Sequence, residues 1–359
     1  MSSTENINKK PSAIRTHRTI ISSLEKTLNN FMTYVRTRQL LAMSYRDSTE
    51  NQAVHIPIKE IEGFFNDYKR LDHKTAFTIL TEKKRLRIIK QTSKNGRTLF
   101  KYQSLEEGSI DMNMIPFRKD NFDNIVIKRI KDYLLDVSII KNSPSTDYFN
   151  FFLKYKYMRP DLFFSVDNFS RRIHTPITNF HKEYRRNILL YGRETSSIDV
   201  VTMQPLLLGK ILKEEIGKNE FSDWINSGID IYNMLQQKAK LKNRNEAKKR
   251  FFEILFSPPS DKLVSVFGKS NWINWVNKYK KQIITQNPNN KKKPHSNLAW
   301  LLQKNEVKIM YSVWQALYRN SIPFLTVHDE IITEKRYYSE AKSLFEEVLS
   351  NNFEYFKLN

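Results

Sequence analysis

Apolar residues recur at helical spacing near the start of the chain. Between residues 17 and 43 they lie three to five positions apart, so they fall on one face of a helix. These positions are Ile20, Leu24, Leu28, Phe31, Val35 and Leu40. The pattern predicts a long amphipathic helix that follows a polar, disordered segment at residues 1–12.

Two shorter helices are predicted next. The apolar positions that mark one face of the first are Ile58, Ile61, Phe65 and Tyr68. Asp72 is placed to cap the second helix, at residues 73–84, because an aspartate side chain accepts hydrogen bonds from the free amides of a first turn.

A β-hairpin is predicted after these helices. Asn95 and Gly96 lie between strand-like runs at 86–92 and 97–102, and this dipeptide is the strongest short hairpin signal. Two helices followed by a basic hairpin resemble a winged helix-turn-helix, with an ordinary helical subdomain and a solvated hairpin as the alternative. The cations available to a phosphate backbone are Lys83, Lys84, Arg85, Arg87, Lys94 and Arg97.

Residues 104–165 contain no sequence pattern typical of a catalytic or ligand-binding site. A helix is predicted at residues 121–135, and residues 148–157 form a dense aromatic run. Asp147 and Asp161 have no acidic partners nearby in the sequence, so we interpret them as caps or surface residues.

The remainder of the chain, from about residue 166, reads as one larger domain. Strands are predicted near 197–203 and 322–334, with several helices between them and a polar, basic loop over 281–294. The predicted class is therefore α+β. The predicted segments are an N-terminal tail and helix (1–50), a winged-helix-like unit (51–108), a helical connector (109–165) and the large domain (166–359).

The amino-acid composition excludes several classes of protein and of functional site. The chain has 40% hydrophobic residues, enough for a packed core, and only eight glycines in 359 residues, which argues against glycine-rich dinucleotide folds. It has no cysteine, which excludes disulfide frameworks, thiolate zinc sites and cysteine nucleophiles. No apolar run of membrane-spanning length and no signal peptide is found, so we expect a cytoplasmic location and no membrane partner.

The charge balance points to a polyanionic partner. The formal net charge is +22, and nucleic acid is the first candidate to neutralise it, with an anionic membrane second. An alternative is the codon bias of an AT-rich genome, which would also explain runs of Asn and Lys such as residues 287–293.

Two acidic residues lie beside predicted strands. Asp199 precedes Val200 and Val201 at a buried strand end, and Asp329 lies at the polar tip of a hairpin near the C-terminus. Two carboxylates on neighbouring strand ends could hold the paired magnesium ions that phosphoryl transfer from a triphosphate uses. Taken singly, each also fits a blander interpretation, a helix cap for Asp199 and a solvated turn for Asp329.

A four-residue ladder lies between the aspartates. Arg244, Lys248, Phe252 and Phe256 share one helical face, so cations that suit phosphates are followed by rings that suit a base. The alternative is a basic amphipathic helix whose phenylalanines belong to the core.

These three stretches, in this order, resemble motifs A, B and C of the family A DNA polymerases. Residues 171–175 and Leu302-Gln303 resemble weaker family segments that contact primer and template, and residues 339–349 and 353–357 echo the family's last helix and strand. The resemblance covers about residues 166–359. It implies a right-hand palm built on an antiparallel sheet, with helical fingers, and it makes residues 109–165 a candidate vestigial thumb.

The resemblance also implies roles for individual residues. Asp199 and Asp329 would hold two Mg²⁺ ions, for which Mn²⁺ can substitute, and Lys248 would protonate the leaving pyrophosphate. The nucleotide would be bound by Arg244, Lys248, Phe252, Phe256 and Gln204. The DNA would be contacted by Arg172, Gln303 and His328, and Glu330 would tune the metal site.

Two departures from the family pattern bear on sugar selection. The family has a glutamate and a tyrosine that pair next to the sugar, where this chain has Gln204 and Phe256. Phe256 has no hydroxyl, and an amide at Gln204 can hydrogen-bond to a 2′-OH. We therefore expect relaxed discrimination against ribonucleotides. The family's glycine after the ladder is also replaced, by the segment 257–259.

Size suggests a reduced member of the family. About 165 residues precede the polymerase-like part, which leaves no room for a proofreading exonuclease. The chain resembles the reduced family A polymerases of mobile elements, including those of staphylococcal cassette chromosomes, which act as primases with a small accessory protein and a replicative helicase. The rivals are a non-catalytic winged-helix DNA-binding replication factor and a relative of single-subunit RNA polymerases.

Overall fold

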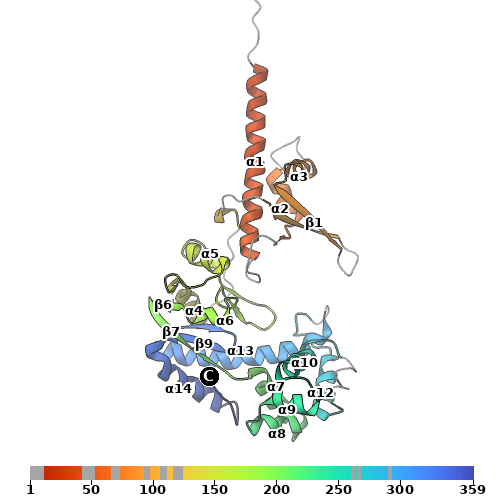
Figure 1. Ribbon diagram of the computed structural model, residues 1–359, viewed down its shortest axis with the longest axis vertical. Coiled ribbons are helices and arrows are strands. Elements are labelled where there is room, and N and C mark those ends of the chain that lie inside the picture. The colour runs from red at the N-terminus through yellow and green to blue at the C-terminus, as the bar shows by residue number, and fades with distance from the viewer. Residues whose placement is uncertain are drawn as a thin grey trace, which may run out of the picture. The chain divides into compact units, whose positions relative to one another are not determined.

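The computed structural model divides into two compact units. The N-terminal unit comprises residues 1–118 and 146–151, and the C-terminal unit comprises residues 119–145 and 152–359 (Figure 1). The residues that the structure describes are 12–42, 53–65, 73–92, 98–105, 111–115, 124–259, 264, 268–289 and 293–359. Within these residues, no helix is long and apolar enough to cross a bilayer.

The N-terminal unit contains the predicted long helix and hairpin. Its elements are α1 (Ser12–Ala42), α2 (Ile58–Phe65), α3 (His73–Glu82), β1 (Leu86–Thr92), β2 (Thr98–Ser104) and the short 3₁₀ helix η2 (Met112–Met114). β1 and β2 pair antiparallel from Leu86↔Ser104 to Thr92↔Thr98, and Val54 forms a further antiparallel bridge to Tyr102. The helix and the hairpin are thus confirmed, whereas Tyr68, Asp72 and the hairpin tip, with Lys94 to Arg97, lie outside the described residues.

Aromatic rings from the helices form the core of this unit. Phe31 of α1 is fully buried and lies 5.5–5.6 Å, between ring centroids, from Phe64, Phe65 and Phe77. Ile61 and Phe65 are buried as the pattern predicted. Ile58, however, is 57% exposed, because it opens α2 and has no preceding turn to cover it.

A five-stranded antiparallel sheet forms the centre of the C-terminal unit. Its strands are β3 (Val137–Ile139), β6 (Ile188–Leu190), β7 (Arg193–Asp199), β8 (Phe324–Val327) and β9 (Glu330–Glu334), in the order β3-β6-β7-β9-β8. The central pair, β7 and β9, runs from Thr195↔Glu334 to Asp199↔Glu330. Together with the helices around it, this sheet confirms the predicted α+β class.

Helices carry the rest of this unit. Figure 1 shows α7 to α12 gathered at one end of the long helix α13 and the strands at its other end, with α14 alongside. Asn219, Asp230 and Asn243 cap α8, α9 and α10 through their side chains. The α-helices of this unit are α4 (Ile125–Leu135), α6 (Lys182–Arg185), α7 (Met203–Ile216), α8 (Glu220–Asn226), α9 (Ile231–Lys238), α10 (Arg244–Phe256), α12 (Asn271–Lys280), α13 (Asn297–Arg319) and α14 (Tyr338–Ser350), and the division between the two units falls within α5 (Asp147–Tyr155). The short elements are β4 (Ser165–Val166), β5 (Ile173–His174) and the 3₁₀ helices η3 (Pro160–Leu162), η4 (Pro294–Ser296) and η5 (Lys335–Tyr337).

Two predicted boundaries around the sheet are wrong. The strand expected over 197–203 ends at Asp199, because Thr202 adopts a left-handed φ of 63° and α7 begins at Met203. The hairpin predicted within 322–334 is confirmed, since β8 and β9 are joined by a tight turn that contains Asp329. Residues 353–357 form no strand: β7 already has β6 and β9 on its two edges, so only Leu358 pairs, as a bridge to Val200 beyond the end of β7.

Two expectations for the region before the sheet also need correction. The helix predicted over 121–135 begins at Ile125, because the side chain of Asn124 accepts from the amides of Val126 and Ile127 and so caps the helix. Asp161 is not a surface residue: it is buried and forms a two-point ion pair with the buried Arg159, with N···O distances of 2.9 Å.

Candidate active site

The two sequence-predicted aspartates lie at the same edge of the central sheet. Asp199 is the last residue of β7 and pairs in register with Glu330, the first residue of β9. Asp329 immediately precedes Glu330 in the two-residue turn between β8 and β9, and its carbonyl accepts from the Val200 amide at 3.4 Å. Both aspartates line one cavity of about 360 Å³. The chain order therefore brings together two carboxylates that lie 130 positions apart in the sequence.

Eight of the eleven residues given site roles from the sequence line this cavity. They are Arg172, Asp199, Gln204, Arg244, Lys248, Phe252, His328 and Asp329, and Glu330 is not among them. Phe256 lies behind Phe252, with ring centroids 5.6 Å apart and planes 22° from parallel. Gln303, on α13, does not line the cavity. Three positions further along the same helix, on the same face, Glu306 does.

Helix α10 presents the cationic ladder to the cavity because its other face is buried. Ala247, Phe251, Ile254 and Leu255 are the buried residues of this helix. Phe251, and not Phe252, is thus its fully buried phenylalanine, which argues against the interpretation that the ladder phenylalanines are simply core. The Asn243 side chain accepts from the Glu246 amide at 2.9 Å and fixes where the helix begins.

Residues of α9 hold the two cations of the ladder. The Arg244 Nε donates to the Asp230 carboxylate at 2.9 Å, and its guanidinium lies 5.0 Å from the centroid of the Tyr232 ring. The Lys248 ammonium lies 5.8 Å from the same centroid. Tyr232 also lines the cavity, and sequence reasoning missed both it and Asp230. Asp230 carried a usable signal, since it is a cap residue directly before a helical pattern.

Acidic side chains are crowded at this edge. Burial, together with the nearby Glu306 and Asp199 carboxylates, raises the pKa of Asp329 to about 8. Burial and Asp199 likewise raise the pKa of Glu330, against the effect of Arg185, which donates to it. The exposed Lys182 donates to the Asp199 carboxylate at 2.7 Å, and this hydrogen bond raises the pKa of Lys182. The site therefore has more carboxylate than its own cations neutralise well.

Asp199 and Asp329 are suited to a metal ion that takes most of its ligands from substrate and water. Among the described residues, no group of three or more His, Asp or Glu side chains is arranged to hold a metal ion. Mg²⁺ is commonly held by one or two carboxylates, with substrate phosphates and water completing its shell. Asp199 and Asp329 fit that pattern, and a cation between them would relieve the repulsion that raises the pKa of Asp329.

Glu306 organises the floor of the cavity. It is 2% exposed and accepts two hydrogen bonds from the Arg172 guanidinium, at 2.9 and 2.6 Å, and a third from the Gln204 amide. Burial raises the pKa of Glu306 in spite of these partners. No local pattern marks this residue in the sequence, because its partners lie 134 and 102 positions away and only the fold brings them together.

Two buried polar atoms of the site have no hydrogen-bond partner within the described part of the chain. They are the Gln204 carbonyl oxygen Oε1 and the His328 ring nitrogen Nδ1. Burial, with Arg172 and His174 nearby, lowers the pKa of His328 to about 4, so its ring is neutral near pH 7. Buried groups of this kind are rare in folded proteins, and a ligand that satisfied them would gain affinity.

The backbone is strained on both sides of the aspartates. Thr202, three residues after Asp199, has a φ of 63°, and His328, directly before Asp329, has a φ of 57°. Non-glycine residues adopt this left-handed region infrequently, and such residues cluster at functional sites.

A scan against protein-family models and a search of the curated proteins found no match to this chain.

Proposed function

We propose that this chain is a template-directed nucleotidyltransferase of the family A DNA polymerase type. The observation that carries the proposal is the single cavity in which Asp199 and Asp329 face Arg244, Lys248 and Phe252. Carboxylates for a metal ion, cations for phosphate and a ring for a base are the three requirements of nucleotidyl transfer. In this interpretation the five-stranded sheet is the palm and α7 to α12 are the fingers.

The residues of the cavity have separable tasks. Arg244 and Lys248 bind the triphosphate, and Lys248 donates a proton to the leaving pyrophosphate. Phe252 stacks on the incoming base or sugar, and Phe256 supports it from behind. Asp199 and Asp329 would hold two Mg²⁺ ions, which when bound supply activation of the primer hydroxyl and neutralisation of the pyrophosphate. Most of the catalysis then comes from positioning and charge neutralisation.

The floor of the cavity is proposed to meet the sugar and the primer terminus. The free Oε1 of Gln204 can accept a hydrogen bond from a ribose 2′-OH, because the amide nitrogen of the same side chain is already committed to Glu306. His328 Nδ1 is available to the primer strand. This arrangement supports the expectation that ribonucleotides are accepted as substrates, as primase activity requires. For a primase of this kind we propose a small accessory protein and a helicase as partners.

The N-terminal unit supports a second, separate attachment to DNA. We interpret the order α1, bridge residue Val54, α2, α3 and hairpin β1–β2 as a winged helix-turn-helix, and the exposed cations beside the hairpin support this interpretation. The exposed cations at its β1 end include Lys83, Lys84 and Arg87. If this unit were the only functional one, the chain would be a non-catalytic DNA-binding factor, which is the second candidate function.

The test is synthesis on a single-stranded template. The protein is incubated with labelled dNTPs or NTPs and Mg²⁺, with and without an annealed primer, and the products are sized. We expect templated extension that stops when the metal is chelated, with both sugar types incorporated. DNA binding without any product under all four conditions would instead support the non-catalytic candidate.

A further inference from the structure

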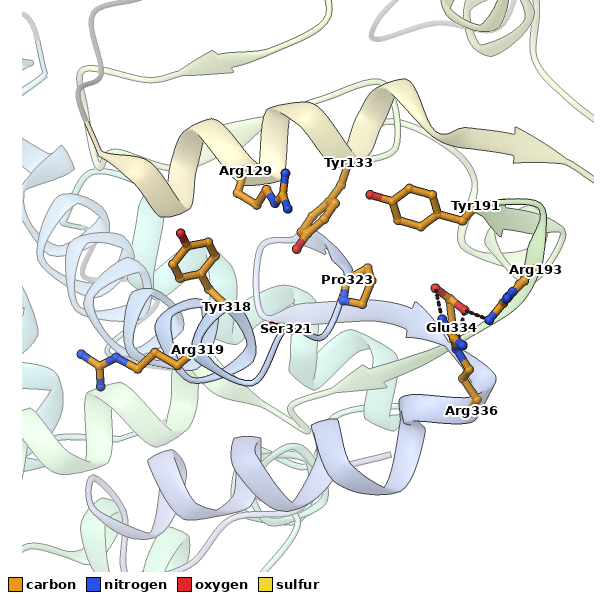
Figure 2. A pocket seen from close by; sticks show the side chains of 10 residues that line it. All are labelled: Arg129, Tyr133, Tyr191, Arg193, Tyr318, Arg319, Ser321, Pro323, Glu334 and Arg336. Carbon is orange, nitrogen blue, oxygen red and sulfur yellow. Dashed lines mark hydrogen bonds and ion pairs between the residues drawn. The ribbon is translucent and has the colours of Figure 1, made fainter.

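A second cavity lies at the opposite end of the central strands. It has a volume of about 610 Å³ and is lined by residues of α4, α13, the β6–β7 turn and β9 (Figure 2). Glu334, the last residue of β9, lies in it, whereas Glu330, the first residue of the same strand, lies at the carboxylate edge. At the rise of a β-strand the two sites are about 13 Å apart along β9.

Arginines dominate the charge of this cavity. Four of them, Arg129, Arg193, Arg319 and Arg336, line it with the carboxylate of Glu334, and the Asp136 carboxylate hydrogen-bonds to Tyr191 beside it. Glu334 is 1% exposed and is paired with Arg193 at 3.5 Å and with Arg336 at 2.8 Å. These two arginines remain more than half exposed. The buried carboxylate therefore orients two guanidinium groups while leaving the cavity strongly positive, which favours an anionic ligand.

Tyrosine rings line the same space. Tyr133 and Tyr191 meet edge to face, with centroids 6.4 Å apart and an angle of 81° between the rings. Figure 2 shows Tyr318 pointing toward Arg129, whose guanidinium lies 5.5 Å from the centroid of Tyr133. Tyr133 is buried, while Tyr191 is 46% exposed. Tyr191 thus offers a flat apolar surface to a ligand, with Tyr133 supporting it.

The backbone holds Tyr191 at the mouth of the cavity in an uncommon conformation. Tyr191 and Gly192 form the two-residue turn between β6 and β7, since Leu190 pairs with Arg193. Both have positive φ, 53° for Tyr191 and 71° for Gly192. Turns of this kind favour asparagine or aspartate at the position that Tyr191 occupies. The Asp136 side chain hydrogen-bonds to Tyr191, and the ring meets Tyr133, so these contacts hold the half-exposed ring at the mouth of the cavity in spite of the conformational cost.

From these observations we propose that the cavity binds single-stranded nucleic acid, with one unpaired base stacked on Tyr191 and the flanking phosphates on the arginines. Rings for stacking beside a basic surround are the combination by which proteins hold single strands without reading their sequence. The volume is that of a small-molecule pocket, which suits a nucleotide but is too small for a helical peptide. The proposal does not depend on catalysis, because the cavity shares no residue with the carboxylate site.

The first test locates a base by photocrosslinking. An all-thymidine oligonucleotide carrying one 5-iodouracil is irradiated with the full-length protein, and the modified peptides are identified by mass spectrometry. We expect a crosslink on Tyr191. The proposal is overturned if crosslinks form only elsewhere. It is also overturned in its strand-binding form if 5-iodo-dUTP alone labels Tyr191 while the oligonucleotide does not, since the cavity would then take a free nucleotide.

The second test measures affinity by fluorescence anisotropy of the same oligonucleotide. Tyr191→Ala should weaken binding at least about fivefold through the loss of stacking, whereas Tyr191→Phe keeps the ring and should match the original protein. The control Tyr157→Ala removes another exposed tyrosine, 68% exposed and outside the cavity, and should have no effect. Equal affinity for Tyr191→Ala and Tyr157→Ala would contradict the proposal.

The salt dependence of oligonucleotide binding tests whether the arginines contact phosphate. Arg129→Gln should reduce the slope of log K against log salt by about 0.7 for each phosphate that it ceases to neutralise. Lys141→Gln, which changes an exposed cation outside the cavity, should leave the slope as it is. An unchanged slope for Arg129→Gln would overturn the phosphate assignment. If neither Tyr191 substitution changes oligonucleotide binding while Arg129→Gln weakens the binding of labelled polyglutamate, the cavity would be assigned to an acidic protein instead.

Discussion

Strands β7 and β9 connect two sites of opposite chemistry. At one end, Asp199 and Asp329 lie with Glu306 and Glu330 in surroundings that raise the pKa of Asp329 to about 8. At the other end, four arginines line the cavity, and the buried Glu334 pairs with two of them, Arg193 and Arg336. An excess of carboxylate calls for a cation, and an excess of guanidinium calls for an anion. The difference shows that Glu330 and Glu334, at the two ends of one strand, lie in opposite electrostatic surroundings, which are set by the charged residues that the neighbouring elements bring.

Each site is also built on a two-residue turn. His328 and Asp329 join β8 to β9 at the carboxylate end, and Tyr191 and Gly192 join β6 to β7 at the arginine end. The first residue of each turn has a left-handed φ, 57° for His328 and 53° for Tyr191. The same backbone device therefore positions a carboxylate at one end of the sheet and an aromatic ring at the other.

Substitution at the carboxylate end should have the most severe consequence. Asp199→Ala and Asp329→Ala should each reduce Mg²⁺-dependent extension by at least about 10⁴-fold, because each removes one of the two ligands that would hold the ions. The measurement is single-turnover primer extension, with Asp223→Ala, an exposed aspartate of α8, as the matched control. If primer extension survives Asp199→Ala or Asp329→Ala, the carboxylate end does not bind the metal ions as proposed, and the proposed difference in function between the two ends is contradicted.

The second largest effect is expected for the buried network around Glu306 of α13, in the floor of the carboxylate cavity. Glu306→Ala should lower the free energy of unfolding by about 3–5 kcal/mol, because it leaves the Arg172 guanidinium without its carboxylate. Urea unfolding measures the change. The control Glu340→Ala removes an exposed carboxylate of α14 and should fall within about 0.5 kcal/mol of the original protein. Equal values for the two variants would show that the network does not stabilise the fold.

Two adjacent lysines of α10 give a matched pair. Lys248 lines the carboxylate cavity and its neighbour Lys249 does not, although both are exposed. Lys248→Ala should lower kcat/KM for the nucleotide by about 10²-fold, as the loss of one charged transition-state interaction does, while Lys249→Ala should change it by less than about threefold. Steady-state extension at varied nucleotide concentration distinguishes them. Similar losses in both variants would mean that net charge, not position, governs the rate.

Lys280 tests how the ladder helix is held. It is buried at the end of α12 and donates to the carbonyls of Ile254 and Ser257 at the end of α10. Burial lowers the pKa of Lys280 to about 8, against about 10.4 in an unfolded chain. Between these values the unfolded state binds more protons, so the free energy of unfolding should rise with pH, by roughly 3 kcal/mol in total.

The control for this pH dependence is substitution along the same helix. Lys280→Met should abolish the rise between about pH 8 and 10, whereas Lys278→Met, an exposed lysine two positions earlier, should retain it. Denaturant melts at several pH values provide the comparison. A rise that persists in Lys280→Met would assign the pH dependence to other groups.

The smallest effect is expected on the preference for deoxynucleotides over ribonucleotides. Gln204→Glu alone places a second carboxylate against Glu306 and should destabilise the floor of the cavity. The double change Gln204→Glu with Glu306→Gln keeps one carboxylate and one amide, and puts the acid next to the sugar. We expect the double variant to prefer deoxynucleotides over ribonucleotides about tenfold more than the original chain does. A preference that does not change would exclude Gln204 from sugar selection.

Local pattern was sufficient for part of this structure. The α10 ladder and the β8–β9 hairpin each depend on residues close in sequence, so periodicity and turn signals predicted them. The strand limits were less accurate, because the end of β7 is set by the left-handed Thr202 and by which strand edges remain free, and neither is visible in a window of residues.

Pairings over long distances could not be predicted. Lys182 with Asp199 and Glu306 with Arg172 join residues that are 17 and 134 positions apart, and they depend on how the sheet and α13 are arranged. The arginine and tyrosine cavity was missed completely. Its rings, Tyr133, Tyr191 and Tyr318, come from three elements with no common spacing, so they become a site only after folding.

Mapping the position of the bound metal would decide whether the two carboxylates act together. Fe²⁺ replaces Mg²⁺ in the presence of primer-template and nucleotide, and hydrogen peroxide and ascorbate are added. The iron reduces the peroxide to hydroxyl radicals, which cleave the nearest backbone, and mass spectrometry maps the cleavage sites. We predict cleavage at two segments together, around Asp199 and around Asp329, with both cleavages abolished in Asp329→Ala. Cleavage at only one of these segments, or a pattern that Asp329→Ala leaves unchanged, would contradict a metal site shared by Asp199 and Asp329.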